Sequence, residues 1–307
     1  MTYTRVRNQE LSITFKPTSS SSDILFSNSK ELFDDIQELL KKKYPDEFFI
    51  KSQEKVGIDF FTKKLIYGEN FTFVKYGDGE IICMIGGKGK NCDDHPYSKK
   101  LGNLLEQSFV KLLRNYDDVY LAEWVDNLVK TRESYLNANS LNPKFADYEC
   151  FLTLDENMND NKLLKFYKLL KNIKRKKIFV GPKKLRDVRG MIDLDHFVEV
   201  PIIDAFSKYD DVLNKLISYG VDDNNIYIFC CSMMSCLLCS DLKEINKKIT
   251  LLDIGSGFDP IFGQKTRPKQ PSAEQCFDYY REILPKNYKF QKTTHAINSL
   301  NKMLTSF

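Results

Sequence analysis

From Phe71 onward, the pattern of hydrophobic and polar positions alternates between two kinds of segment. Short apolar runs rich in β-branched and aromatic residues predict strands at 71–76, 119–124, 177–181, 197–200, 226–231 and 249–254. Apolar residues at helical spacing predict helices at 98–115, 160–174, 184–192, 205–219 and 232–246. This alternation is typical of βα units, in which helices cover both faces of a mostly parallel sheet. The predicted fold class is therefore α/β, with a Rossmann-like sheet.

The beginning of the chain carries a different pattern. Residues 1–25 include a polar, serine-rich run without an apolar period, which predicts a flexible or extended arm. A capped amphipathic helix is predicted over 29–43, and residues 46–69 fit a mixture of helix and loop. Because no internal repeat or convincing linker follows, residues 26–307 are expected to form a single domain.

Composition narrows the class of protein. The 307 residues include 46 basic and 42 acidic side chains, a net charge of +4, which is too balanced to predict nucleic-acid binding. No apolar run approaches the roughly 20 residues of a membrane span, and the N-terminus lacks the apolar core of a secretory signal. We therefore expect a cytoplasmic protein without a membrane span. Four of the eight cysteines crowd residues 230–239, where they are expected to act as small buried hydrophobes.

The sharpest chemical signal is the acidic motif Gly77-Asp78-Gly79-Glu80, which directly follows the first predicted strand. Glycines on both sides of Asp78 allow a sharp turn. The two carboxylates then lie at the carboxyl end of a strand, where open α/β sheets bind ligands. Their oxygens suit a hard divalent cation such as Mn²⁺ or Mg²⁺. From this spacing alone, a solvated acidic turn is the alternative.

A second glycine motif, Asp253-Ile254-Gly255-Ser256-Gly257, ends the last predicted strand. It resembles the first motif of Rossmann-like S-adenosylmethionine-dependent methyltransferases. That motif normally opens its fold, whereas residues 258–307 are too few for the remaining strands of such a sheet. The methyltransferase interpretation would require a circular permutation, and it is kept as an alternative.

Other predicted strand ends point to the same ligand crevice, namely Gly181, Pro182 and Ser232. The loop after the last strand carries Lys265 and Arg267, which could clamp a phosphate or a sugar. A solvated loop is the alternative interpretation of that segment.

A glycine- and lysine-rich loop at 86–95 lacks the Gly-Lys-Ser/Thr ending of a Walker loop, but it could close over a phosphorylated ligand. It contains Asn91 and His95. His95 could serve as a ligand or a base, although a single loop histidine more often does neither.

Together these segments resemble the glycosyltransferases of the GT-D fold. In that family a strand runs into a G-D-G-E-like turn, whose D-x-E pair serves the metal and the nucleotide sugar. The match here begins at Tyr76–Glu80 and continues in Asn91–Tyr97, Phe179–Pro182 and Asp253–Pro260. Matching segments span residues 76–260, more than half of the chain.

The resemblance implies a metal-dependent glycosyltransferase of the hexosyltransferase type. It would move a sugar from a nucleotide-sugar donor to a glycan or another hydroxyl acceptor. Asp78 and Glu80 inherit the catalytic and metal-binding role, with Mn²⁺ or Mg²⁺ as the cofactor. Contacts to the nucleotide sugar are expected at Tyr76, Gly77, Gly79, Asn91, Gly181, Pro182, Ser232, Lys265 and Arg267.

An inverting transfer also needs a carboxylate that deprotonates the acceptor hydroxyl. Glu123, Asp253 and Asp259 all lie near predicted strand ends, and the sequence does not choose among them. A retaining outcome stays open as well. A second alternative, of another class, is a non-catalytic module that binds a nucleotide sugar without turning it over.

Overall fold

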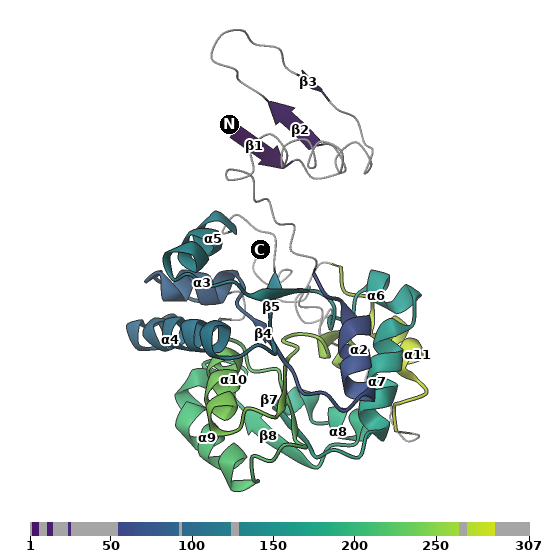
Figure 1. Ribbon diagram of the computed structural model, residues 1–307. Helices are drawn as coiled ribbons and strands as arrows, with labels where there is room; N and C mark the ends of the chain where they lie inside the picture. The colour runs from purple at the N-terminus through teal and green to yellow at the C-terminus, as the bar shows by residue number, and fades with distance from the viewer. Residues whose placement is uncertain are drawn as a thin grey trace, which may run out of the picture. The chain divides into compact units, whose positions relative to one another are not determined.

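The computed structural model describes most of the chain after Lys55 and three short segments before it (Figure 1). The described residues are 2–5, 11–14, 24–25, 55–91, 94–123, 129–263 and 269–285. Contacts divide the chain into two compact units, Met1–Ser52 and Gln53–Phe307, and each is described by itself. The helix predicted over 29–43 lies outside the described residues.

In the first unit, the described residues form a small antiparallel sheet. Its order is β1-β2-β3, with strands β1 (Thr2–Arg5), β2 (Leu11–Thr14) and β3 (Ile24–Leu25). These strands fall within the segment that the sequence predicts to be an arm. The boundary between that arm and the α/β domain stays a prediction.

The second unit is built on a parallel sheet, which has seven strands in the described residues. The strand order is β6-β5-β4-β10-β9-β7-β8, and every neighbouring pair is parallel. The strands are β4 (Thr72–Lys75), β5 (Val119–Glu123), β6 (Lys144–Asp147), β7 (Lys177–Pro182), β8 (His196–Val200), β9 (Ile226–Phe229) and β10 (Thr250–Asp253). This confirms the predicted α/β, Rossmann-like fold class.

Helices cover both faces of this sheet, as predicted (Figure 1). One face packs against α2 (Ile58–Ile66), α7 (Lys162–Asn172), α8 (Val188–Ile192) and α11 (Ala273–Tyr280). The other packs against α3 (Asp78–Met84), α4 (Lys99–Asn115), α5 (Val129–Ala138), α9 (Tyr209–Ser218) and α10 (Met234–Ile245). Shorter elements are α6 (Asp155–Asn159) and the 3₁₀ turns η1 (Lys183–Leu185), η2 (Ala205–Lys208) and η3 (Asp259–Phe262).

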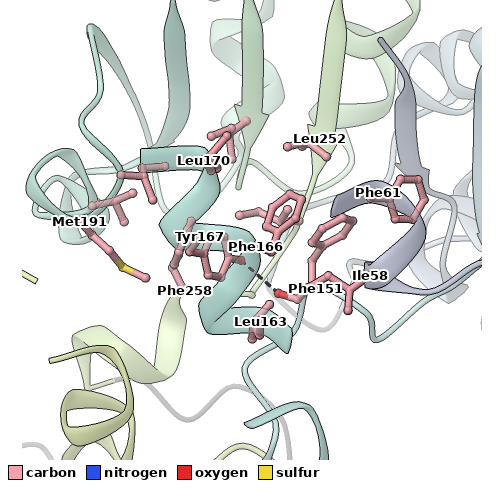
Figure 2. Packing of buried hydrophobic residues seen from close by; sticks show 14 of the residues in the cluster. Ile58, Phe61, Phe151, Leu163, Phe166, Tyr167, Leu170, Met191, Leu252 and Phe258 are labelled. Carbon is pink, nitrogen blue, oxygen red and sulfur yellow. Dashed lines mark hydrogen bonds between the residues drawn. The ribbon is translucent and has the colours of Figure 1, made fainter. Parts of the chain in front are cut away.

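The layer on the α2 and α7 face is strongly aromatic (Figure 2). Phe151 is fully buried there, with ring centroids 4.8 Å from Phe73 and 4.9 Å from Phe166. The hydroxyl of Tyr167 donates to the backbone oxygen of Phe151 at 3.4 Å. Because burying one such side chain contributes about 1.5–3 kcal/mol, this cluster fixes the position of the sheet's central strands.

The structure also differs from the predicted elements in instructive places. Strand β6 was not predicted, because Lys-Phe-Ala-Asp is short, half polar and only partly buried at the sheet's edge. The acidic motif was predicted as a turn, but Asp78 begins helix α3. No helix in the described part of the chain is both long and apolar enough to cross a membrane.

Candidate functional site

A pocket with a volume of about 360 Å³ lies at the carboxyl ends of β4, β7, β9 and β10. Parallel strands bring the segments that follow them to one edge of the sheet, so residues far apart in the sequence meet there. The volume falls within the range of small-molecule sites. The pocket therefore occupies the place where this architecture normally binds its ligand.

Most of the predicted site residues are brought together in this pocket. Those that line it are Asp78, Gly79, Glu80, Asn91, Pro182, Ser232, Asp253 and Asp259. His95, which the sequence left without a role, lines it as well. The acidic motif and the late glycine motif thus contribute to the same pocket.

Four other predicted residues lie elsewhere in the described structure. Tyr76 is buried in the layer on the α4 face, where its hydroxyl is 2.7 Å from that of Ser108. Gly77 caps α3, and Gly181 lies inside β7. Glu123, at the end of β5, forms ion pairs with basic groups rather than lining the pocket; its partners are Lys55 and Arg132. Lys265 and Arg267 lie outside the described residues.

The glycines of the acidic motif are required because a Cβ atom at either position would lie very close to a neighbouring residue, and not because the backbone is unusual. Gly77 has an extended conformation, with φ −79° and ψ −163°. A Cβ atom at Gly77 would lie 3.0 Å from the hydroxyl oxygen of Tyr148. A Cβ atom at Gly79 would lie 3.0 Å from the Cβ of Asn91. The motif therefore holds the start of α3 tightly against two neighbouring segments of the pocket wall.

The first turn of α3 places the two motif carboxylates differently. Asp78 is exposed, whereas Glu80 turns back so that its Oε2 accepts the backbone N–H of Gly77 at 2.9 Å. Burial, together with the negative charges of Asp253 and Asp78, raises the pKa of Glu80 to about 8. A cation between these carboxylates would reverse that effect and favour the ionised form.

Asp253, the last residue of β10, is the most enclosed acid of the pocket, with 4% of its surface exposed. Burial raises its pKa to about 7. The charge of Lys75 and the backbone N–H groups of Lys75 and Gly255 act in the opposite direction. Gly255 has φ +53°, a left-handed conformation that favours glycine, so the turn after β10 depends on it.

Asn91 fixes the loop that precedes α4 to the end of β9. Its Nδ2 donates to Oγ of Ser232 at 2.9 Å, and its Oδ1 accepts the backbone N–H of His95 at 2.9 Å. His95 is buried, and its Nδ1 accepts the N–H of Ala205 at 3.3 Å. This bond leaves the proton of the neutral ring on Nε2, which fixes the tautomer of a pocket-lining histidine.

Several lining residues were not singled out from the sequence, chiefly Lys75, Tyr148, Lys184, Ile202 and Ile203. Lys75 carried a signal, since it is a lysine at the end of an otherwise apolar strand. Tyr148 follows strand β6, and because that strand was not predicted, nothing indicated that Tyr148 lies at the carboxyl edge of the sheet. Lys184 pairs with Asp259 at 3.6 Å, which adds a second cation to the pocket wall.

The donor set fits a cation that is shared with a ligand better than one held by protein alone. Across the described residues, no group of three or more His, Cys, Asp or Glu side chains is arranged to hold a metal ion. Asp78 and Glu80 supply two carboxylates to one pocket. Mg²⁺-type ions are commonly bound through one or two carboxylates together with substrate phosphates and water. The residues present fit that second arrangement.

No protein-family model and no curated protein matches this chain. Among solved structures, one described as a new glycosyltransferase (DUF1792) from Streptococcus sanguinis is similar in fold. The TM-score is 0.50 at 16% sequence identity, over 80% of this chain and 97% of that one. A second is described as the highly conserved domain of unknown function 1792 with a distinct glycosyltransferase fold. Its TM-score is 0.49 at 17% identity, over 84% of this chain and 95% of that one.

At these identities the likeness concerns the fold. The chain shares the parallel α/β architecture of the Streptococcus sanguinis protein over nearly that protein's whole length. What the pocket of this chain does must be argued from its own residues.

Proposed function

We propose that this chain is a metal-dependent glycosyltransferase that moves a sugar, of the hexosyl type, from a nucleotide-sugar donor to a hydroxyl acceptor on a glycan or glycoconjugate. The observation that carries the proposal is the position of Asp78 and Glu80 in the pocket at the carboxyl edge of the sheet. The fold likeness to a structure described as a glycosyltransferase supports it. A cytoplasmic location remains part of the proposal.

Asp78 and Glu80 would hold a divalent cation, Mn²⁺ or Mg²⁺, together with the donor diphosphate. Such an ion supplies charge stabilisation for the leaving diphosphate. Glu80 is oriented by its hydrogen bond from the N–H of Gly77, and the exposed Asp78 lines the same pocket. Because the pKa of Glu80 is raised to about 8, a nearby cation would stabilise the ionised form of its carboxyl group.

Two of the three candidate bases line the pocket. Asp253 has a pKa raised to about 7 by burial, close to the value that suits a general base at neutral pH. Asp259 is buried and pairs with Lys184. Glu123 pairs with Lys55 at the end of β5, so the proposal assigns the acceptor's proton to Asp253 or Asp259.

The direct test is release of nucleoside diphosphate from a panel of UDP, GDP, CDP, ADP and dTDP sugars, measured with Mn²⁺, with Mg²⁺ and with a chelator. We expect metal-dependent turnover of one donor class by the unaltered protein. We expect a loss of at least about 100-fold in Asp78→Asn and Glu80→Gln. Asp210→Asn is the matched control, because Asp210 is an exposed acid in the first turn of α9.

The alternatives give different results in the same assays. Turnover that is independent of metal and survives both substitutions would contradict the proposed role of the acidic motif. Binding of S-adenosylmethionine, with no binding of any nucleotide sugar, would favour the methyltransferase interpretation of the glycine motif after β10. Nucleotide binding without turnover for any acceptor would favour the non-catalytic module.

A further inference from the structure

Lys75 is a buried lysine in the pocket wall. It is the last residue of β4, and only 6% of its surface is exposed. Because side chains alternate along a strand, Lys75 shares the face of Phe73, and its nitrogen lies 5.9 Å from the centroid of that ring. Burial of an ammonium group costs free energy unless a charge or a polar partner compensates it. The negative charge of Asp253 interacts with the positive charge of Lys75, which compensates part of this cost inside the pocket wall.

The surroundings of Lys75 direct its ammonium toward the pocket. The nitrogen lies 4.5 Å from the ring centroid of Tyr148, close enough for a cation–π interaction. A Cβ atom at Gly255 would lie 3.7 Å from this nitrogen, so the ammonium lies over the turn that follows β10. Tyr148 and Gly255 both line the pocket, as does Lys75 itself.

The backbone of Lys75 is held on both sides. Its N–H donates to Oδ2 of Asp253 at 3.3 Å, and its carbonyl oxygen accepts the thiol of Cys236 at 3.0 Å. These two hydrogen bonds fix the backbone from which the side chain of Lys75 projects, where β4 lies beside β10. A positive charge on a side chain whose backbone is fixed in this way is preorganised for an anionic ligand.

We propose that Lys75 binds the diphosphate of the donor directly and stabilises the leaving group; this inference rests on the proposed function. A diphosphate that enters this pocket meets five carboxyl groups, so it needs positive charge of the protein's own; they belong to Asp78, Glu80, Asp94, Asp253 and Asp259. Lysine is a common phosphate ligand that acts as a point charge. Lys75 is within the pocket and beside the acidic motif.

The chemical step balances with Lys75 as a charge rather than as an acid. The bond between the anomeric carbon and the phosphate oxygen breaks, and its electron pair stays on the diphosphate. The acceptor oxygen forms the new bond to that carbon, and its proton passes to a carboxylate base. The ammonium of Lys75 keeps its protons throughout and stabilises the negative charge that develops on the leaving oxygen.

This role has a consequence for the base of an inverting transfer. The leaving group and the activated acceptor lie on opposite faces of the sugar ring in such a reaction. Asp253 accepts the N–H of Lys75, so it lies on the leaving-group side. Asp259 pairs with Lys184 in the turn that follows β7, and the role of the base is then assigned to Asp259.

The test is the dependence of affinity on the number of phosphates. Calorimetry would compare the nucleoside, its monophosphate and its diphosphate, with Mn²⁺ and with a chelator, using the nucleotide that the unaltered protein binds best. In Lys75→Met we expect the diphosphate to bind about 10- to 100-fold more weakly and the nucleoside to bind unchanged. Lys75→Arg should restore part of the loss. Lys208→Met is the control, because Lys208 is exposed and pairs with Asp211.

Each outcome decides a different question. Equal loss for the nucleoside and the diphosphate would show that Lys75 only supports the local structure, and unchanged diphosphate affinity would show that it does not touch the ligand. Either result overturns the role of Lys75 and leaves the proposed function standing. Failure of the unaltered protein to bind any nucleotide would contradict the proposed function, and the role of Lys75 with it. If Lys75→Met does not fold, the same comparison is made with Lys75→Gln. A ratio of nucleoside affinity to diphosphate affinity equal to that of the unaltered protein would then overturn the proposal.

Discussion

The backbone N–H of Lys75 donates to Oδ2 of Asp253, with 3.3 Å between nitrogen and oxygen. This bond joins the ends of β4 and β10, two neighbouring parallel strands from opposite ends of the α/β domain's sequence. It brings the acidic motif that follows β4 beside the glycine motif that follows β10. Two motifs that suggest rival functions in the sequence therefore belong to one pocket.

The raised pKa of Asp253 predicts a specific dependence of stability on pH. The folded-state pKa is about 7, against a usual value of 3.8, so the folded protein binds this proton more tightly than the unfolded chain. The contribution of Asp253 to stability is therefore most favourable below about pH 4 and is lost as the pH rises toward 7. Asp253→Asn should remove this loss.

The measurement is the free energy of unfolding of both proteins from pH 4 to pH 8. The difference in favour of Asp253→Asn should grow with pH by up to about 4 kcal/mol, which is the full shift converted to free energy. Glu80 titrates in both proteins, so its effect on stability is reduced when the free energies of unfolding of the two proteins are subtracted. A difference that stays constant over this range would contradict the buried, ionisable environment assigned to Asp253.

Phe151 should be among the most sensitive positions for stability. Its ring is fully buried and contacts the rings of Phe73 and Phe166. We expect Phe151→Ala to lower the free energy of unfolding by about 3–5 kcal/mol, measured by chemical denaturation, because it leaves a cavity in the aromatic layer. Tyr67→Ala, at a position 74% exposed, should change stability by less than about 0.5 kcal/mol. Similar effects of both substitutions would contradict the packing described for this layer.

Gly79 should matter for activity more than for folding. A Cβ atom there would lie 3.0 Å from the Cβ of Asn91, so Gly79→Ala must displace either the start of α3 or the Asn91 loop. We expect donor turnover to fall about 10- to 100-fold, because small displacements of positioning groups carry costs of that size. Gly57→Ala is the matched control, since a Cβ atom at Gly57 would have no neighbour within 4 Å. Full activity in Gly79→Ala would argue against a tight contact at this point.

The sequence predicted the sheet well where strands are strongly apolar. The six predicted strands all occur. Five of them are central strands, which read as continuous apolar runs because both faces are covered, and the sixth is the edge strand β8. Strand β6 was missed because a short edge strand that is half polar lacks that signal. The predicted helix at 205–219 is divided into η2 and α9, a change of helix type that apolar spacing does not reveal.

The site was predicted in outline because parallel strands share one carboxyl edge. Asp78, Glu80 and Asp253 could be placed there by counting strands. The face to which each side chain points was harder to predict. Along β4 and the residue after it, Tyr76 joins the apolar layer on the α4 face, whereas Lys75 joins the pocket. The alternation of side chains along a strand places Lys75 and Tyr76 on opposite faces of the sheet. It does not say which of the two faces the pocket until the structure is known.

The proposed glycosyltransferase function depends most directly on a divalent cation at Asp78 and Glu80. The test is a titration with Mn²⁺ in which electron paramagnetic resonance measures the bound ion. The titration is done in the presence of the nucleoside diphosphate that the unaltered protein binds best. We predict one bound ion, whose affinity falls more than about tenfold in Asp78→Asn and in Glu80→Gln and is unchanged in Asp210→Asn. Equal Mn²⁺ affinity in all four proteins would contradict the assignment of the metal to the acidic motif.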